Sequence, residues 1–300
     1  MTQHLYGGVN AAVLTPMRDD LGVDLDRLAA RCQALLDEGC DGLAVLGTTG
    51  EANSLGIDER LALLDGLAER GVDAARLLPG TGTPSITDTV TLTRRAAALG
   101  CRGVLMLPPF FYKGPSEDGL FAWFSEVINR VGVGTAIYLY HFPQHSGVPF
   151  TPDLVARLIR AFPGTVRGIK DSSGDYEFTG RIARAHAPDG FEVYCGDDTA
   201  LHRLLGDGGA GCITAASNLT APVAAAVYAA RGGADGAAAQ ARLTALRRAV
   251  GTVAPLIPAV RSLVARRTGD PAWRTTRPPF LPLAPAEEAA LFAAWDAAAG

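Results

Sequence analysis

The sequence lacks long apolar runs and any excess of basic charge. No stretch approaches the roughly 20 consecutive apolar residues of a membrane-spanning helix. The first ten residues, MTQHLYGGVN, lack the basic and apolar segments of a signal peptide. The formal net charge is −4 and the isoelectric point is near 5.7, which argues against nucleic acid or an anionic membrane as the partner. We therefore expect a cytoplasmic protein that acts on small molecules.

Cysteine is scarce and irregularly spaced. The 300 residues include five cysteines, an odd number, and no two of them form a C-x-x-C motif. They are Cys32, Cys40, Cys101, Cys195 and Cys212. Such a pattern favours buried, reduced thiols over disulfides or a zinc site.

Short β-rich runs alternate with helical patterns along most of the chain. This alternation predicts parallel strands joined by right-handed crossovers. The predicted strands cover residues 8–15, 43–46, 77–82, 103–107, 136–140, 166–170, 191–195 and 211–214. About eight strand-helix units within the first 220 residues predict an α/β fold, a (β/α)8 TIM barrel. An open doubly wound sheet is the alternative.

The remaining tail is alanine-rich and helical in pattern, with breaks at glycine and proline. No Gly-, Ser- or Pro-rich linker separates it from the rest of the chain. We predict a barrel over residues 1–220 and a C-terminal helical extension over residues 221–300 that packs on the barrel.

One lysine stands at the predicted C-terminal end of a barrel strand. The segment Val166-Arg167-Gly168-Ile169-Lys170 reads as a short apolar strand, and turn residues follow it. Desolvation at such a place disfavours the charged ammonium, and only a neutral amine attacks a carbonyl carbon. Lys170 is thus a candidate for Schiff-base chemistry, although a strand-end lysine can also extend to solvent.

Other polar residues follow neighbouring strands, and barrel enzymes place their catalytic groups at this end. Thr48 and Thr49 lie in a Gly-Thr-Thr-Gly turn that can bind an anion through backbone N–H groups and hydroxyls, or can be a plain tight turn. Tyr140 ends the strand before that of Lys170 and can move a proton, or can be a core aromatic. Asp197 and Asp198 can bind a metal, hydrogen-bond substrate hydroxyls or cap the next helix.

Two histidines have metal-ligand spacing but an unfavourable context. His141 and His145 are four residues apart, which on a helix would suggest a zinc pair. Pro143 lies between them and the segment leaves a strand, so we expect no metal.

In order and spacing, these motifs resemble the dihydrodipicolinate synthase / N-acetylneuraminate lyase superfamily over nearly the whole chain. The matching segments are Leu14-Thr15-Pro16, Gly47-Thr48-Thr49-Gly50-Glu51, 109–112, 140–143, Gly168-Ile169-Lys170, Gly196-Asp197-Asp198 and Arg277-Pro278-Pro279. The resemblance implies a metal-free class I lyase without a cofactor, in which Lys170 forms a covalent Schiff base with pyruvate. Thr48 and Thr49 would bind its carboxylate, and Tyr140 would be the general acid/base.

The resemblance implies further roles outside these motifs. The Ile213 main chain would help position the pyruvyl group. Tyr112, the one tyrosine in its loop, would enter a proton relay from a neighbouring subunit. Family members are usually homotetramers, built as dimers of dimers.

One departure from the synthase pattern bears on the second substrate. The synthases have an arginine two residues after the strand-end Tyr-x-x-Pro proline, where it holds a carboxylate, and this chain has His145. The segment is more similar to the 2-keto-3-deoxy sugar-acid aldolases, with Gln144, His145, Ser146 and Asp197 as hydrogen-bonding partners for a hydroxylated aldehyde.

The sequence is thus consistent with four functions. The first is a lyase that makes or cleaves a 2-keto-3-deoxy sugar acid from pyruvate and an aldehyde. The others are dihydrodipicolinate synthase, acting on pyruvate and aspartate semialdehyde, a keto-deoxy-sugar-acid dehydratase, and a non-enzymatic regulatory protein that binds pyruvate or a sugar acid.

Overall fold

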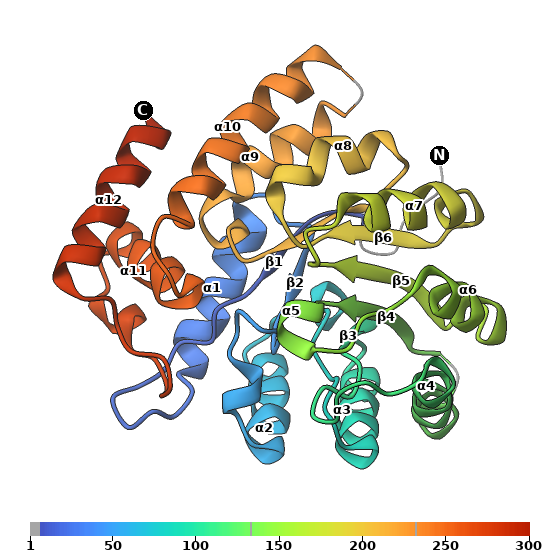
Figure 1. Ribbon diagram of the computed structural model, residues 1–300. Helices are drawn as coiled ribbons and strands as arrows, with labels where there is room; N and C mark the ends of the chain where they lie inside the picture. The colour runs from blue at the N-terminus through green and yellow to red at the C-terminus, as the bar shows by residue number, and fades with distance from the viewer. Residues whose placement is uncertain (1–6, 133, 232) are drawn as a thin grey trace.

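Parallel strands form the wall of a barrel in the computed structural model, which describes residues 7–132, 134–231 and 233–300 (Figure 1). The regular strands in this part of the chain are β1 (Gly8–Ala12), β2 (Gly42–Ala44), β3 (Gly103–Met106), β4 (Ala136–His141), β5 (Val166–Asp171), β6 (Glu192–Cys195) and β7 (Gly211–Thr214). Their order in the sheet is β2-β1-β7-β6-β5-β4-β3, and neighbouring strands are parallel.

The segment predicted as a strand at residues 77–82 closes the barrel in irregular form. Single parallel bridges join Leu77 to Leu43 on β2 and Gly80 to Leu105 on β3. Pro79 lies between these bridges and has no N–H, so the ladder toward β3 loses one hydrogen bond. The eighth strand position of the barrel is therefore filled by an irregular extended segment, and the predicted (β/α)8 barrel is confirmed.

Helices surround the barrel and extend beyond it. They are α1 (Leu25–Asp37), α2 (Ile57–Glu69), α3 (Ile86–Ala98), α4 (Glu117–Val131), α5 (Pro143–Ser146), α6 (Pro152–Ala161), α7 (Tyr176–His186), α8 (Leu201–Gly206), α9 (Ser217–Ala229), α10 (Ala234–Val250), α11 (Leu256–Thr268) and α12 (Pro285–Ala299). Local signals start several of them: Asp24, Ser116 and Thr151 each accept a hydrogen bond from a backbone N–H in the first turn.

The barrel interior is filled at its centre. Ala12, Ala44, Leu105 and Ile213 pack there with two tyrosines, Tyr138 and Tyr194. Both tyrosine hydroxyls donate to the buried Glu192 carboxylate at 2.7 Å. Because side chains occupy this layer, an open cavity can form only nearer the strand ends.

The C-terminal helices pack against one side of the barrel, beside α1 and α9 (Figure 1). Leu14 and Leu219 join the apolar cluster of this extension, and Arg267 on α11 pairs with Glu38 after α1 at 3.1 Å. The predicted extra helices are thereby confirmed as part of the fold. The expected boundary at residue 220 falls inside α9, and the division into two parts remains a prediction.

All five cysteines are buried free thiols, as the sequence predicted. Burial raises the pKa of the Cys32 and Cys40 thiols to about 12, which keeps them protonated and unreactive. Within residues 7–132, 134–231 and 233–300, none of the helices has both the length and the apolar character needed to cross a bilayer.

Candidate active site at the strand ends

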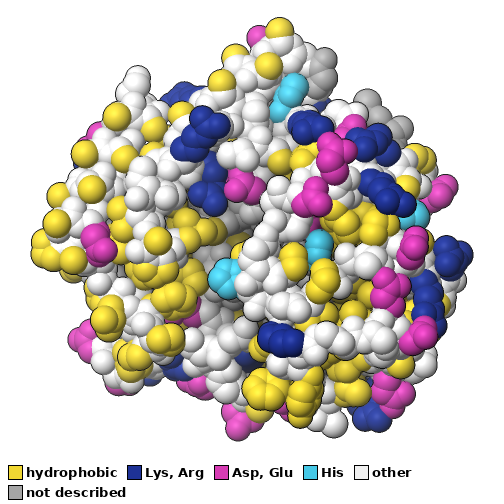
Figure 2. Space-filling model, in the orientation of Figure 1, with side chains coloured by type: hydrophobic (Ala, Val, Ile, Leu, Met, Phe, Trp, Pro, Cys, Tyr) yellow, Lys and Arg dark blue, Asp and Glu magenta, His cyan; other side chains and the backbone are white. Residues whose placement is uncertain are grey.

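A cavity of about 530 Å³ opens at the carboxyl ends of the strands. Figure 2 shows the hollow near the middle of this face. Polar residues predicted from the sequence line it: Thr48, Thr49, Tyr140, Gln144, His145, Lys170 and Asp197. The C-terminal extension supplies an apolar wall from Pro255, Leu256, Ile257 and Phe280. Residues that are far apart in the chain thus share one cavity because parallel strands end at one face.

Lys170 and Tyr140 are neighbours on adjacent strands. Their Cα atoms are register partners between β5 and β4. Lys170 is only 5% exposed, and its Nζ lies 4.2 Å from the centroid of the Tyr140 ring. The predicted burial of this amine and its adjacency to the tyrosine are thus both present in the structure.

A glycine makes room for this pair. Gly168 precedes Lys170 by two residues, so both face the barrel interior. A Cβ atom on Gly168 would lie 2.3 Å from the Glu192 carbonyl oxygen and 2.6 Å from the Tyr138 ring. The Gly-x-Lys spacing therefore lets the central layer of the barrel pack directly beneath the lysine.

The Gly-Thr-Thr-Gly turn reaches the same cavity from β2. The Thr48 Oγ1 atom lies 3.3 Å from the Tyr140 hydroxyl oxygen. Two residues with positive φ bracket the turn, Leu46 at 55° and Glu51 at 54°. These backbone conformations are costly for residues other than glycine and collect at functional sites.

The residues predicted to hold the second substrate lie at the cavity mouth. Gln144 and His145 are exposed on the short helix α5. The Gln144 amide donates to the carbonyl oxygen of Ser173, and the His145 ring packs edge-on against Phe142, with their centroids 4.2 Å apart. These contacts orient α5 above the lysine.

His141 faces away from the cavity, unlike His145. Its Nδ1 is 2.9 Å from Asp171 Oδ1, and both side chains are buried. Alternation along a strand explains this, because His141 and Asp171 each follow an inward-facing catalytic candidate. The described part of the chain contains no group of three His, Cys, Asp or Glu side chains arranged to hold a metal ion.

Asp197 caps the turn that follows it and also lines the cavity. Its side chain accepts from the Thr199 N–H at 2.9 Å, which caps the following turn, and it also lines the cavity. Arg247 on α10 has its Nη2 atom 3.5 Å from Asp197 Oδ2 and its Nε atom 3.9 Å from Asp198 Oδ2. Burial raises the pKa of Asp198 to about 6, and a hydrogen bond from Thr214 opposes the shift.

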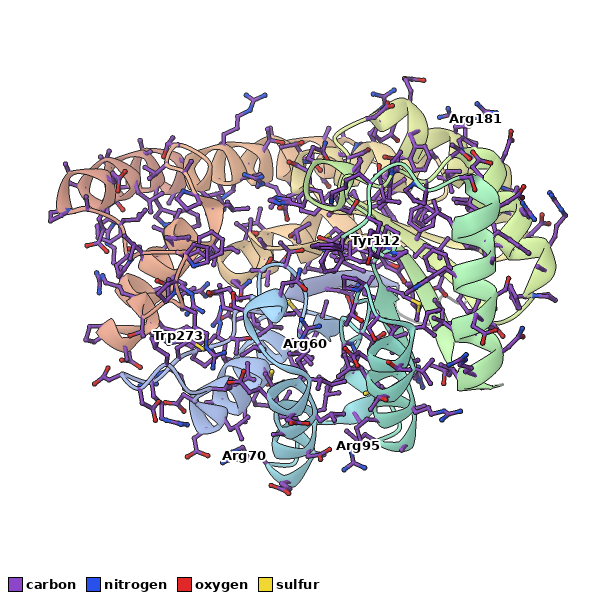
Figure 3. All side chains as sticks on the ribbon, turned by 60° about the horizontal axis from the view of Figure 1, so that its bottom comes forward. Arg60, Arg70, Arg95, Tyr112, Arg181 and Trp273 are labelled. Atoms are coloured by element: carbon purple, nitrogen blue, oxygen red, sulfur yellow. The ribbon has the colours of Figure 1, made fainter. Side chains whose placement is uncertain are left out.

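Two predicted residues lie outside the cavity lining. Ile213 is buried in β7, and Ala215, two residues further on, reaches the cavity instead. Tyr112, labelled in Figure 3, lies on the loop between β3 and α4 and is 78% exposed, with its ring edge-on to Phe111. Within one subunit Tyr112 therefore takes no part in the described cavity.

Sequence reasoning missed several residues of the lining. Arg247 comes from an alanine-rich helix with no motif around it, and the apolar wall comes from the tail. Ser172 and Ser173 had a usable signal, since they follow the end of the Lys170 strand, and Glu51, Phe142 and Gly196 lie within motifs already noted.

The fold is a (β/α)8 barrel with a polar cavity at the strand ends, the face at which enzymes of this fold have their active sites. The model of the dihydrodipicolinate synthetase family matches residues 5–298. An uncharacterized DapA-like lyase from Chloroflexus aurantiacus is 37% identical over 292 residues, which is 96% of each chain. A 4-hydroxy-tetrahydrodipicolinate synthase from Kineococcus radiotolerans is 33% identical and covers 96% of this chain and 92% of its own.

Solved structures of the same family are similar to this chain over nearly its whole length. Dihydrodipicolinate synthase from Agrobacterium tumefaciens has a TM-score of 0.89 at 35% identity and covers 97% of this chain and 98% of its own. YagE from Escherichia coli is a prophage protein of the same family, solved in complex with pyruvate. It has a TM-score of 0.91 at 27% identity, and the match covers 98% of this chain and 99% of the YagE chain. The chain belongs to the dihydrodipicolinate synthetase family, and the expected lyase class is confirmed at that level.

Proposed function

We propose that the protein is a pyruvate-dependent Schiff-base lyase that makes or cleaves a 2-keto-3-deoxy sugar acid. The observation that carries the proposal is the buried Lys170 amine beside Tyr140 in a cavity that also contains Thr48. A desolvated amine next to a phenol suits imine formation, because the phenol can carry the protons that this reaction moves.

The reaction divides into three steps. The Lys170 amine adds to the keto carbon of pyruvate, and the carbinolamine then loses water to give an imine, with Tyr140 transferring the protons. Loss of a methyl proton gives an enamine, whose carbon attacks the aldehyde to form the new C–C bond. Water then hydrolyses the imine and frees the lysine; cleavage is the same sequence reversed.

The other predicted residues have supporting roles. Thr48 and Thr49 hold the pyruvate carboxylate, with the Ile213 main chain behind the pyruvyl group. Gln144, His145 and Asp197 hydrogen-bond the hydroxyls of the aldehyde portion. The protein works without a metal or cofactor in the cytoplasm, as a homotetramer in which Tyr112 of one subunit joins the proton relay of the next.

A second candidate function is 4-hydroxy-tetrahydrodipicolinate synthase. Several relatives carry that name, including the one from Kineococcus radiotolerans. His145, in place of a guanidinium, is the feature that favours the sugar-acid reaction, because a guanidinium binds a carboxylate in bidentate fashion.

Reduction with borohydride in the presence of pyruvate tests the covalent step. The sequence contains only two lysines, Lys113 and Lys170, so mass spectrometry of peptides assigns the adduct directly. We expect the adduct on Lys170, and its absence would contradict lyase chemistry. A panel of aldehydes then tests the second substrate: turnover of aspartate semialdehyde without turnover of glyceraldehyde would favour the synthase.

A further inference from the structure

A buried ion pair links the C-terminal extension to the Gly-Thr-Thr-Gly turn. Glu51 directly follows the turn and lines the cavity. Arg261, on α11, is fully buried, and its Nε donates to Glu51 Oε1 at 2.8 Å. Its Nη2 contacts the same oxygen. The two residues are 210 positions apart, so only the tertiary fold brings them together.

The Arg261 guanidinium is also connected to the turn indirectly, through Thr15. Arg261 Nη2 donates to the Thr15 carbonyl oxygen at 2.5 Å. The Thr15 hydroxyl in turn donates to the Gly50 carbonyl oxygen at 2.7 Å. Arg261 Nη1 contacts the carbonyl oxygen of Trp273 at 3.4 Å, which ties the arginine to its own end of the chain.

The turn held in this way has a strained backbone. Leu46 and Glu51, on either side of it, have φ values of 55° and 54°. Such residues keep this conformation only where their surroundings impose it. The carboxylate of Glu51 is fixed by Arg261, so the arginine holds one of the two strained residues directly.

Charge gives a second reason for the pairing. Glu51 lines the same cavity as Thr48 and Thr49, where the substrate carboxylate is proposed to bind. An unpaired Glu51 carboxylate would repel that anion. Stability alone does not require such a pair, because an apolar pair of similar volume is often as stable.

We propose that Arg261 is a positioning residue for the keto-acid carboxylate: it fixes the Thr48-Thr49 turn and neutralises Glu51. The C-terminal extension then contributes to substrate binding as well as to packing. This inference rests on the proposed pyruvate chemistry.

The test follows the rate of borohydride-trapped adduct formation as a function of pyruvate concentration. For Arg261→Met we expect the half-saturating pyruvate concentration to rise at least about tenfold, while the maximal rate changes less than about threefold. Arg31→Met is the matched control. Arg31 is also a buried arginine paired with a glutamate, Glu38, but it is outside the cavity lining. This control should lower the melting temperature and leave half-saturation unchanged.

Unchanged half-saturation in a folded Arg261→Met protein would overturn the inference, as would an equal rise in Arg31→Met. If Arg261→Met does not fold, the double variant with Glu51→Gln decides, since it leaves no unpaired buried charge. A rise of at least about fivefold in that variant supports positioning, and no rise refutes it. Failure of wild-type protein to form any adduct would instead overturn the proposed function itself.

Discussion

The hydroxyl oxygens of Tyr140 and Thr48 lie 3.3 Å apart, although 92 residues separate them in the chain. The contact joins the end of β4 to the turn after β2 across the barrel mouth. It places a phenol between the proposed carboxylate site and the Lys170 amine, over which its ring lies. In the proposed mechanism, proton transfer and substrate binding therefore depend on the same small group of atoms.

Tyr140→Phe should lower kcat by about 10² to 10⁴-fold, because the ring remains and only the proton-carrying hydroxyl is lost. Circular dichroism should show an unchanged fold, since the ring still stacks on Phe142 at 5.9 Å. Steady-state kinetics with pyruvate and the best aldehyde of the panel measures the effect. A loss of less than about threefold would remove Tyr140 from proton transfer.

Thr48→Val keeps the shape of the side chain and removes its hydroxyl. We expect the half-saturating concentration of pyruvate to rise about tenfold, the usual effect of losing one hydrogen bond to a charged group. Thr48→Ser restores the hydroxyl and should restore binding. If the serine variant binds pyruvate as weakly as the valine variant, the hydroxyl is not the binding group.

His145→Ala should affect the second substrate alone. His145 is exposed at the cavity mouth on α5, whereas Lys170 is buried below it. We expect kcat/KM for the aldehyde to fall about tenfold with adduct formation from pyruvate unchanged, which corresponds to one lost hydrogen bond. Equal losses for both substrates would show that the histidine acts on the whole site.

Gly168→Ala tests the packing beneath the lysine. The added Cβ would lie 2.3 Å from the Glu192 carbonyl oxygen, so a backbone segment must move. We expect a loss of about 3 kcal/mol in the free energy of unfolding. Gly206→Ala is the control, because no atom lies within 4 Å of its Cβ position at the end of α8, and it should cause no loss. Urea denaturation compares the two, and equal stabilities would contradict the packing argument.

Asp198→Asn should change how stability depends on pH. The Asp198 pKa rises from 3.8 to about 6 on folding, mainly because of burial. Between these values the folded protein keeps a proton that the unfolded chain has released, so this group lowers the free energy of unfolding as pH rises through the window. Asparagine does not titrate. The stability of the variant relative to wild type should therefore increase by about 2 kcal/mol between pH 4 and pH 7.

Urea denaturation at several pH values gives this difference directly. A difference between variant and wild type that stays constant from pH 4 to pH 7 would mean that Asp198 keeps its ordinary pKa in the folded protein.

Much of the proposed site could be predicted because its chemistry lies in short motifs at strand ends. Thr48 follows a recognisable strand, Tyr140 and Lys170 lie at the ends of theirs, and parallel strands bring such ends to one face. The irregular form of the segment at residues 77–82 was harder to predict, because Pro79 favours an extended backbone yet removes a hydrogen bond between strands. Tyr112 shows another limit, since its proposed role depends on a second subunit.

The order of strands and helices, the barrel and the identity of the strand-end lysine follow from the sequence alone, because periodicity and turn residues are local properties of the chain. Only the tertiary structure decided that Arg261 meets Glu51, that Arg247 reaches the cavity and that His141 turns away toward Asp171. Those pairings join distant parts of the chain through packing of whole helices and strands, and no local pattern encodes them.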